Sequence, residues 1–167
     1  MRCRCVVLGV AVLGAAALLG PAAASAATSC PSATPAEAVG AALVDKYVAS
    51  INAHDTSTFP ELFTDGYQQH SGRSPDGLAA QVENFRRVFA ATPDHRVQVD
   101  DCIIAGDRVV ARTTHTATHT GTFRGIPPTG KPFTYRTIDI WRVEHGKFAE
   151  HWDLTDAADV LRELSAK

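Results

Sequence analysis

The segment Tyr135–Asp156 reads YRTIDIWRVEHGKFAEHWDLTD and predicts a β-hairpin. Two strand-like runs flank the loop Glu144-His145-Gly146, whose glycine suits the left-handed position of a three-residue turn with a glycine bulge. Such a turn fixes which residues of the two strands lie opposite each other. The expected pairs are Val143 with Lys147, Asp139 with His151, and Thr137 with Asp153.

The two faces of this hairpin differ in character, because successive side chains of a strand point to opposite sides. One face is polar and carries Thr137, Asp139, Trp141, His151 and Asp153. The other face is apolar and carries Ile138, Ile140, Phe148 and Trp152. Two carboxylates and a histidine on one patch of sheet form either a solvent-facing surface or a reaction site.

Residues 1–26 predict a secretory signal peptide. Arg2 and Arg4 form a basic start, residues 6–19 form an apolar run too short to span a bilayer comfortably, and Ala24-Ser25-Ala26 suits a cleavage site. We therefore expect a secreted, extracellular protein whose mature part does not associate with membranes. Residues 27–34 are expected to be a linker and residues 35–167 one folded domain.

Charge and cysteine content narrow the partners of the mature chain. The full chain has a formal net charge of −2, and the part after residue 26 has −4, because the signal segment holds two arginines and no acid. A net negative charge gives no reason to expect binding to a nucleic acid or to an anionic membrane. Cys30 and Cys102 remain after cleavage, and they either form a disulfide or stay as separate thiols. Two cysteines do not provide the framework of a metal site.

Two long helices are expected before the strands. Thr34-Pro35-Ala36-Glu37 combines an N-cap, a first-turn proline and a capping-box glutamate, and a short helical turn is expected over residues 58–63. Ser74 and Pro75 predict the start of a second helix, which stops before Pro93. The apolar stripes at helical spacing are Val39, Leu43, Tyr47 and Ile51 in the first helix, and Leu78, Val82, Phe85 and Phe89 in the second.

After Pro93 the pattern changes to the alternation typical of strands. Strands are expected over residues 96–105 and 108–120, followed by a proline- and glycine-rich loop over residues 121–131, the hairpin, and a short helix over residues 156–164. Helices followed by antiparallel strands in one small domain predict an α+β fold. We expect a curved antiparallel sheet packed on the N-terminal helices around a cone-shaped pocket.

Several motifs resemble the SnoaL-like polyketide cyclases, the ester cyclase group of the NTF2-like superfamily. They are PDHRV at residues 93–97, GDRV at 106–109, THTGTFRGIPPTG at 118–130, DIWRV at 139–143 and EHWD at 150–153. The similarity extends from about Val39 to the end of the chain. It implies an NTF2-like cone-shaped α+β barrel with a deep pocket and an oligomer formed through the sheet.

The resemblance also implies a chemistry. In such cyclases an aspartate on the last strand acts as general acid and base in an intramolecular aldol ring closure, without metal or organic cofactor, and Asp153 matches that position. A histidine or asparagine after an early aromatic turn matches His70. The polar pair of the preceding strand falls on Thr137 and Asp139, where polyketide enzymes tend to have Gln and His.

The residue types fit this chemistry. A carboxylate with an ordinary pKa of about 4 is a weak base unless burial and a nearby negative charge raise its pKa. A pocket that contains Asp153 and Asp139 supplies both effects, and His151 or His70 would then donate to the developing oxyanion. The alternatives are that Asp153 caps the last helix or pairs with an arginine, that Asp139 is structural, and that His151 only hydrogen-bonds Asp139.

Other residues are expected to line the pocket, although each also fits plain core packing. They are Thr137, Trp141, His119, Tyr47, Phe63, Phe85 and Phe89. His115 is expected to be a hydrogen-bonded core histidine, and its separation from His119 along a strand, about 13 Å, is too long for a shared metal. His54, His95 and His145 are expected at the surface or in turns.

Two functions follow from these observations. The first is an enzyme that performs cofactor-free acid/base catalysis, an aldol-type cyclisation or an isomerisation, on a small apolar carbonyl compound. The second is a non-catalytic secreted module that binds a small apolar molecule in the same pocket. An open cavity that reaches Asp153 would favour the enzyme, and a cavity filled by Trp141 and the phenylalanines would favour a structural or binding role. The apolar face of the hairpin predicts a homodimer through the sheet.

Overall fold

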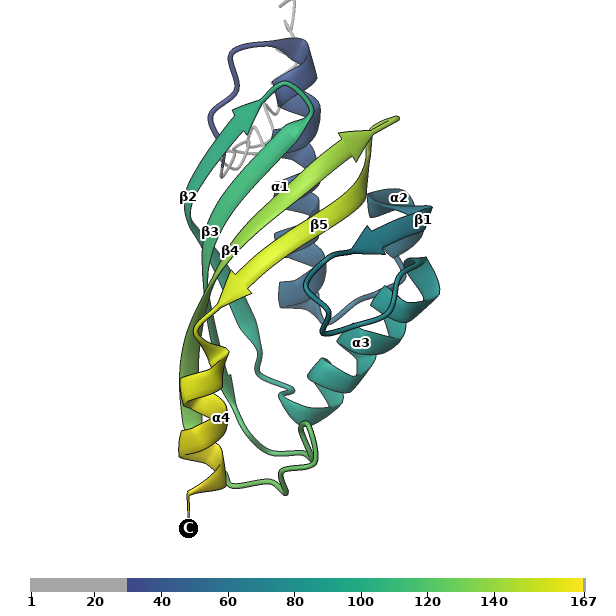
Figure 1. Ribbon diagram of the computed structural model, residues 1–167. Coiled ribbons are helices and arrows are strands. Elements are labelled where there is room, and N and C mark those ends of the chain that lie inside the picture. The colour runs from purple at the N-terminus through teal and green to yellow at the C-terminus, as the bar shows by residue number, and fades with distance from the viewer. Residues whose placement is uncertain (1–29, 167) are drawn as a thin grey trace, which may run out of the picture.

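The computed structural model describes residues 30–166, which form a mixed α+β fold (Figure 1). The predicted signal peptide and the first three residues of the predicted linker, 27–29, therefore lie outside the described residues. The helices are α1 Pro35–Ala53, α2 Phe59–Leu62, α3 Leu78–Ala91 and α4 Ala157–Ser165. The strands are β1 Phe63–Gln69, β2 Arg96–Ala105, β3 Arg108–Thr118, β4 Pro132–Glu144 and β5 Lys147–Thr155.

Helix α1 begins where the sequence predicts. The Glu37 amide donates to Thr34 Oγ1 at 3.2 Å, the Thr34 amide donates to Glu37 Oε2 at 3.0 Å, and Pro35 occupies the first turn. The start of α3 at Ser74 is wrong, because the helix begins at Leu78. Gly77, with a φ of 94°, donates its amide to the Tyr67 carbonyl at 2.6 Å, so residues before it are held against β1 instead of entering the helix.

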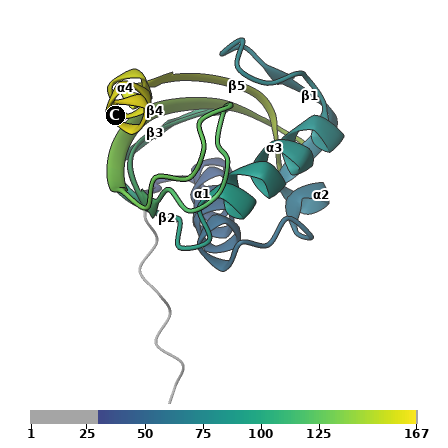
Figure 2. The same cartoon turned by 90° about the horizontal axis from the view of Figure 1, so that it is seen from below.

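The five strands form one sheet in the order β1-β5-β4-β3-β2. All neighbours are antiparallel except β1 and β5, which are parallel. Figure 2 shows that the sheet curves around α1 and α3, which cover its concave face. Strand β1 is not among the strands expected from the sequence.

The predicted register of the hairpin is wrong. The turn has two residues, His145 and Gly146, with φ values of 50° and 74°, and it places Glu144 opposite Lys147. A bulge between Arg142 and Val143 shifts the pairing once more. The resulting pairs are Trp141 with His151, Asp139 with Asp153, and Thr137 with Thr155.

The polar face of the hairpin nevertheless points inward. Thr137, Asp139 and His151 are 8%, 7% and 6% exposed, whereas Ile138 and Ile140 are 48% and 37% exposed on the other side. Phe148, expected on the outer face, is fully buried, because the bulge turns Phe148 and Ala149 both into the interior. Every second residue of β3 from Val109 to Ala117 is buried, as the alternation of side chains along a strand requires.

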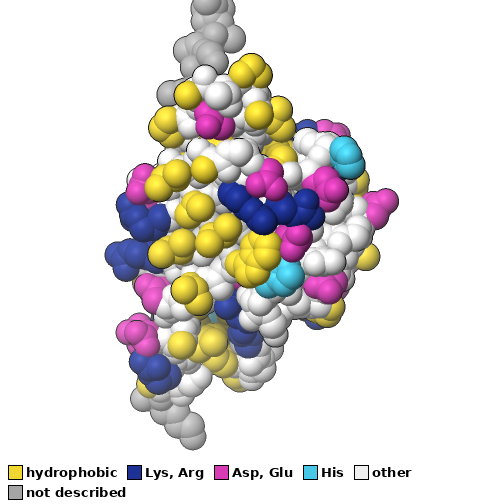
Figure 3. Space-filling model, turned by 45° about the horizontal axis from the view of Figure 1, so that its top comes forward, with side chains coloured by type: hydrophobic (Ala, Val, Ile, Leu, Met, Phe, Trp, Pro, Cys, Tyr) yellow, Lys and Arg dark blue, Asp and Glu magenta, His cyan; other side chains and the backbone are white. Residues whose placement is uncertain are grey.

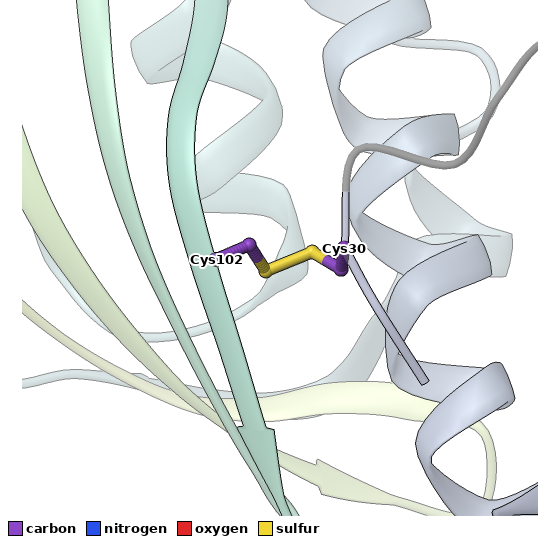
Figure 4. Close-up of a disulfide and its surroundings, with 2 residues drawn as sticks. All are labelled: Cys30 and Cys102. Atoms are coloured by element: carbon purple, nitrogen blue, oxygen red, sulfur yellow. A yellow bond between two sulfur atoms is a disulfide. The ribbon is translucent and has the colours of Figure 1, made fainter. Parts of the chain in front are cut away.

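An aromatic core fills the end of the fold near α1 and α2. Tyr47 packs edge-on against four other rings, with centroid distances between 5.5 and 6.3 Å. Those rings are Phe63, Phe85, Trp141 and Phe148. A disulfide between Cys30 and Cys102 joins the segment that precedes α1 to β2, with the two Cα atoms 5.0 Å apart (Figure 4). Of the two alternatives for these cysteines, the structure shows the paired one.

Candidate active site

A buried carboxylate–histidine pair lies at the centre of the inner face of the sheet. His151 Nε2 lies 2.9 Å from Asp139 Oδ1, and both side chains are less than a tenth exposed. The indole of Trp141 stacks on the His151 ring with centroids 5.0 Å apart and planes 8° apart. Neighbouring strands therefore hold both members of the pair in fixed orientations.

Gln69 at the end of β1 fixes the protonation of His151. Its Nε2 lies 2.9 Å from His151 Nδ1, while its Oε1 accepts from the Ser71 amide at 3.2 Å. An amide nitrogen only donates, so His151 Nδ1 accepts and Nε2–H donates to Asp139. A neutral His151 that donates to an ionised Asp139 satisfies every one of these contacts.

A chain of hydrogen bonds extends from Asp139 along the inner faces of β4 and β3. Asp139 Oδ2 accepts from the Thr137 hydroxyl, Thr137 and Thr113 Oγ1 are 2.6 Å apart, and Thr113 Oγ1 lies 3.0 Å from His115 Nε2. His115 Nδ1 in turn lies 3.0 Å from His95 Nε2. All five side chains are less than a tenth exposed.

Both histidines of this chain are held neutral. Burial lowers the pKa of His115 to about 4, against the opposing effect of Asp139. Burial and, after it, the neighbouring His115 lower the pKa of His95 to about 3. His115 is the hydrogen-bonded core histidine that the sequence predicts. The expectation that His95 lies at the surface is wrong, because it is 2% exposed between α3 and β3.

Asp153 lies on β5 directly opposite Asp139 on β4. Directly opposite residues of an antiparallel pair have Cβ atoms about 5 Å apart. Asp153 Oδ2 forms an ion pair with Arg73 Nη2, from the loop that follows β1. Its Oδ1 is buried and has no hydrogen-bond partner within residues 30–166. The pairing with an arginine that was one alternative for Asp153 is therefore present, yet half of the carboxylate remains uncommitted.

His70 does not join this group, contrary to expectation. Gln69 pairs with His151 in the parallel register of β1 and β5 and points inward, so the next residue points outward. The His70 ring stacks on Trp152, with centroids 4.3 Å and planes 7° apart, and its Nε2 lies 2.9 Å from Glu150 Oε2. His70 thus belongs to the outer surface of the sheet.

The residues expected to line a pocket mostly belong to the core. Tyr47, Phe63, Phe85 and Trp141 form the aromatic cluster, and Phe89 packs partly buried against it. His119 is fully buried, with Nδ1 3.1 Å from Thr129 Oγ1 and Nε2 without a partner in the described chain. Thr137 belongs to the hydrogen-bonded chain. The core-packing alternative therefore describes the four clustered aromatic side chains.

Two surface depressions lie away from these residues. One lies at the end of the sheet beside α4 and is lined by Asp94, Thr116, Ala117, Thr118, Pro132, Phe133, Thr134 and Glu163. The other lies beside the disulfide, between residues 31–33 and residues 102–104. Within residues 30–166 there is no group of three or more His, Cys, Asp or Glu side chains suited to a metal ion. The same residues contain no helix long and apolar enough to cross a membrane.

The site residues expected from the sequence did not include Gln69, Arg73, Thr113 or His95. Thr113 shares the inward face of β3 with His115, so strand alternation alone contains that signal. Gln69 and Arg73 carry no such signal, because both depend on the parallel pairing of β1 with β5, which joins residues more than 80 positions apart.

Comparison with known proteins assigns this arrangement to a family. A family model described as SnoaL-like polyketide cyclase matches residues 41–164, while no curated protein matches the chain. The solved structure of TsrD from Streptomyces laurentii is similar, with 29% identity, a TM-score of 0.72, and coverage of 78% of this chain and 97% of that one. IdmH from Streptomyces antibioticus is 27% identical with a TM-score of 0.64, covering 75% of this chain and 97% of its own.

The fold is also shared with more distant structures. A SnoaL-like polyketide cyclase from Agrobacterium tumefaciens is 21% identical with a TM-score of 0.65, over 75% of this chain and 97% of that one. The family match spans most of the described residues, and the curved five-stranded sheet with four helices is the NTF2-like architecture expected from the sequence. The chain belongs to the SnoaL-like polyketide cyclase family.

Proposed function

We propose that this protein catalyses a cofactor-free, acid/base reaction of the cyclase or isomerase type on a small apolar carbonyl compound, with Asp153 as the proton acceptor. The observation that carries the proposal is the buried, uncommitted Oδ1 of Asp153 opposite the Asp139–His151 pair. A buried carboxylate oxygen without a partner is costly for the folded protein, and such atoms concentrate at functional sites.

The other carboxylate is fully engaged and suits a supporting role. Asp139 accepts from His151 at Oδ1 and from the Thr137 hydroxyl at Oδ2, so both of its oxygens already accept hydrogen bonds from the protein. Its charge lies directly opposite Asp153 and opposes a second negative charge there. Asp139 and His151 are thus positioning and electrostatic residues for Asp153.

The reaction follows from these positions. Asp153 Oδ1 takes a proton from the carbon next to a carbonyl, and the enolate oxygen gains negative charge. Arg73 is ion-paired to the same carboxylate and brings several N–H donors to the site, which supports a role as the enolate donor. In a cyclisation the enolate carbon attacks a second carbonyl of the same molecule, and Asp153 returns its proton to the new alkoxide.

The test measures the first step alone. Small ketones and β-keto esters are incubated with the protein in D2O, and loss of the α-proton signal is followed by NMR. Asp153→Asn should slow the exchange by about 10²-fold or more, the usual contribution of general acid/base catalysis. Asp107→Asn, in the exposed turn between β2 and β3, is the matched control and should exchange at the wild-type rate. Wild-type exchange by Asp153→Asn would exclude Asp153 as the base.

One observation favours a non-catalytic role, structural or binding, which includes the second candidate, a module that holds a small apolar molecule without converting it. Trp141 and three phenylalanines fill the interior near α1, and neither depression described above reaches Asp153. Saturable quenching of tryptophan fluorescence by an apolar ligand, together with no exchange above background for any substrate in the panel, would support the module and reject the enzyme.

We also propose that the protein is secreted and acts as a homodimer through its sheet. The N-terminal segment and the Cys30–Cys102 disulfide support secretion, because disulfides persist in oxidising compartments. Exposed apolar side chains of the outer face support the dimer, and Figure 3 shows hydrophobic side chains gathered there beside a band of charged ones. They include Ile138, Ile140 and Leu154, which are 48%, 37% and 76% exposed.

A further inference from the structure

We propose that His95, His115, Thr113 and Thr137 form a directed proton path that ends on Asp139. The path rests on the proposed function and deepens it, since it links the acid/base site to His95 on the side remote from Asp153. Its geometry is a continuous line of four contacts between buried side chains on β4, on β3 and at His95, the residue before β2.

The direction of donation is fixed from the Asp139 end. An ionised carboxylate only accepts, so the Thr137 hydroxyl must donate to Asp139 Oδ2. A hydroxyl has a single proton, and the Thr137 proton is then used. The 2.6 Å contact with Thr113 therefore requires the Thr113 hydroxyl to donate to Thr137 Oγ1, in preference to the longer 3.4 Å contact that the same hydroxyl makes with Asp139 Oδ2.

The same reasoning fixes the tautomers of both histidines. The Thr113 proton is used, so His115 Nε2 must carry hydrogen and donate to Thr113 Oγ1 across 3.0 Å. A neutral His115 then has a bare Nδ1, and His95 Nε2 must donate to it across 3.0 Å. The remaining nitrogen, His95 Nδ1, is a bare acceptor, and this buried atom has no partner within residues 30–166.

A chain in which every group donates in one direction transfers a proton without moving any heavy atom far. When a hydronium ion of the solvent gives its proton to His95 Nδ1 and leaves as water, His95 releases its Nε2 proton to His115 Nδ1, and His115 passes its own Nε2 proton to Thr113. Thr113 passes its proton to Thr137, which protonates Asp139 Oδ2. One N–H bond forms at His95, one O–H bond forms at Asp139, and each intermediate group gains one proton and loses one.

Neutralising Asp139 has a consequence for Asp153. The two carboxylates lie directly opposite each other, and the repulsion between them is removed when Asp139 carries the proton. The path therefore controls the charge of Asp139, which lies opposite the proposed base. Its entry at His95 is remote from Asp153, so a substrate at Asp153 does not block it.

The charged and titratable groups around the path come from several elements. Near His95 these are His54 of the α1 cap, Asp94 and Arg96, and near His115 they include Asp100 of β2. Asp139 acts on the side chains of Tyr47, Tyr67, Tyr135 and Arg73. Burial raises the pKa of each of the three tyrosines, so they stay protonated and do not compete for the transferred proton.

The first test reads the tautomers directly, on the whole protein with its disulfide intact. Long-range proton–nitrogen NMR at pH 7 should show His95, His115 and His151 all with hydrogen on Nε2. Thr113→Val removes the central hydroxyl and should change the signals of His115 and His95 while leaving His151 unchanged. An Nδ1–H tautomer of His115 in the wild type would reverse the chain and overturn the proposal.

The second test asks whether the path conducts. On acidification the carboxyl carbon of Asp139 should titrate in the same step in which His95 and His115 change tautomer, and Thr113→Val should separate the two events. Thr113→Ser should restore the coupling, and Thr116→Val, an exposed position on the outer face of β3, is the matched control. An Asp139 signal that titrates identically in wild type and Thr113→Val would refute the path. These readouts need no substrate, so a failure of the path is distinguishable from a failure of the proposed reaction.

Discussion

The buried histidine pair is expected to make the stability of the fold sensitive to acid. The pKa of His115 is lowered to about 4 and that of His95 to about 3 in the folded protein, against an ordinary value of about 6.5 in the unfolded chain. Because folding lowers these pKa values, the two neutral histidines contribute fully to the free energy of unfolding above pH 6.5. That contribution is lost as the pH falls toward the folded-state pKa values. Each histidine then costs about 1.4 kcal/mol of unfolding free energy per pH unit.

Two such groups give a slope of about 2.7 kcal/mol per pH unit below pH 6. Between pH 6 and 4.5 the loss is about 4 kcal/mol, a large part of the 5–15 kcal/mol typical of a domain. His115→Phe should reduce the slope to about 1.4 kcal/mol per pH unit. The phenyl ring keeps the stacking on Tyr135, where the ring centroids are 4.5 Å apart. At pH 7 the variant should lose about 1–3 kcal/mol, because the Nε2–H of His95 has lost its acceptor.

Urea unfolding at half-unit steps from pH 7 to 4.5 measures both quantities. His145→Asn is the matched control, because His145 is exposed in the β4–β5 turn and asparagine also tolerates its φ of 50°. Its slope should equal that of the wild type. Equal slopes for His115→Phe and the wild type, or a wild-type stability that stays flat from pH 6.5 to 5, would refute the buried neutral pair.

Three further predictions concern packing, covalent linkage and assembly. Gly121→Ala should destabilise the fold by about 1–3 kcal/mol in a thermal melt, because the added Cβ would lie 2.6 Å from a backbone oxygen near the end of α3. Gly66→Ala is the control and should be nearly neutral, because its added Cβ meets nothing within 4 Å. Replacing Cys30 and Cys102 by serine opens a link between residues 72 positions apart and should cost about 4 kcal/mol in urea unfolding; equal stability with and without reductant would contradict this. Ile140→Lys should yield monomers in sedimentation, and a wild type that is already monomeric across the concentration range would reject the dimer.

The sequence predicts those parts of the fold that local chemistry specifies. Helix α1 follows from the Thr34–Glu37 capping box, and the inward direction of Asp139 and His151 follows from strand alternation. The hairpin register does not follow, because Gly146 suits both a three-residue turn and the two-residue turn observed. The bulge that turns Phe148 inward depends on how side chains from the whole interior pack together, which the local sequence does not show.

In the candidate site, too, some residues follow from local sequence and others depend on contacts between distant parts of the chain. Asp153, Asp139 and His151 lie on one predicted hairpin, so their proximity was accessible from sequence. Gln69 and Arg73 reach them only through a parallel strand pairing, and short polar runs such as those around β1 carry no periodic signal for it. The family resemblance pointed to His70, one residue beyond the side chain that contacts His151.

The disulfide also affects solubility. β2 is an edge of the sheet, and an exposed edge strand offers unpaired backbone groups to other molecules. Cys102 lies on this edge strand, next to Ile103, which is 61% exposed. The bond to Cys30 keeps residues 31–33 beside that edge, where they share a groove with residues 102–104. Reduction would release this cover, so we expect the reduced protein to aggregate through β2 at temperatures where its fold is still intact.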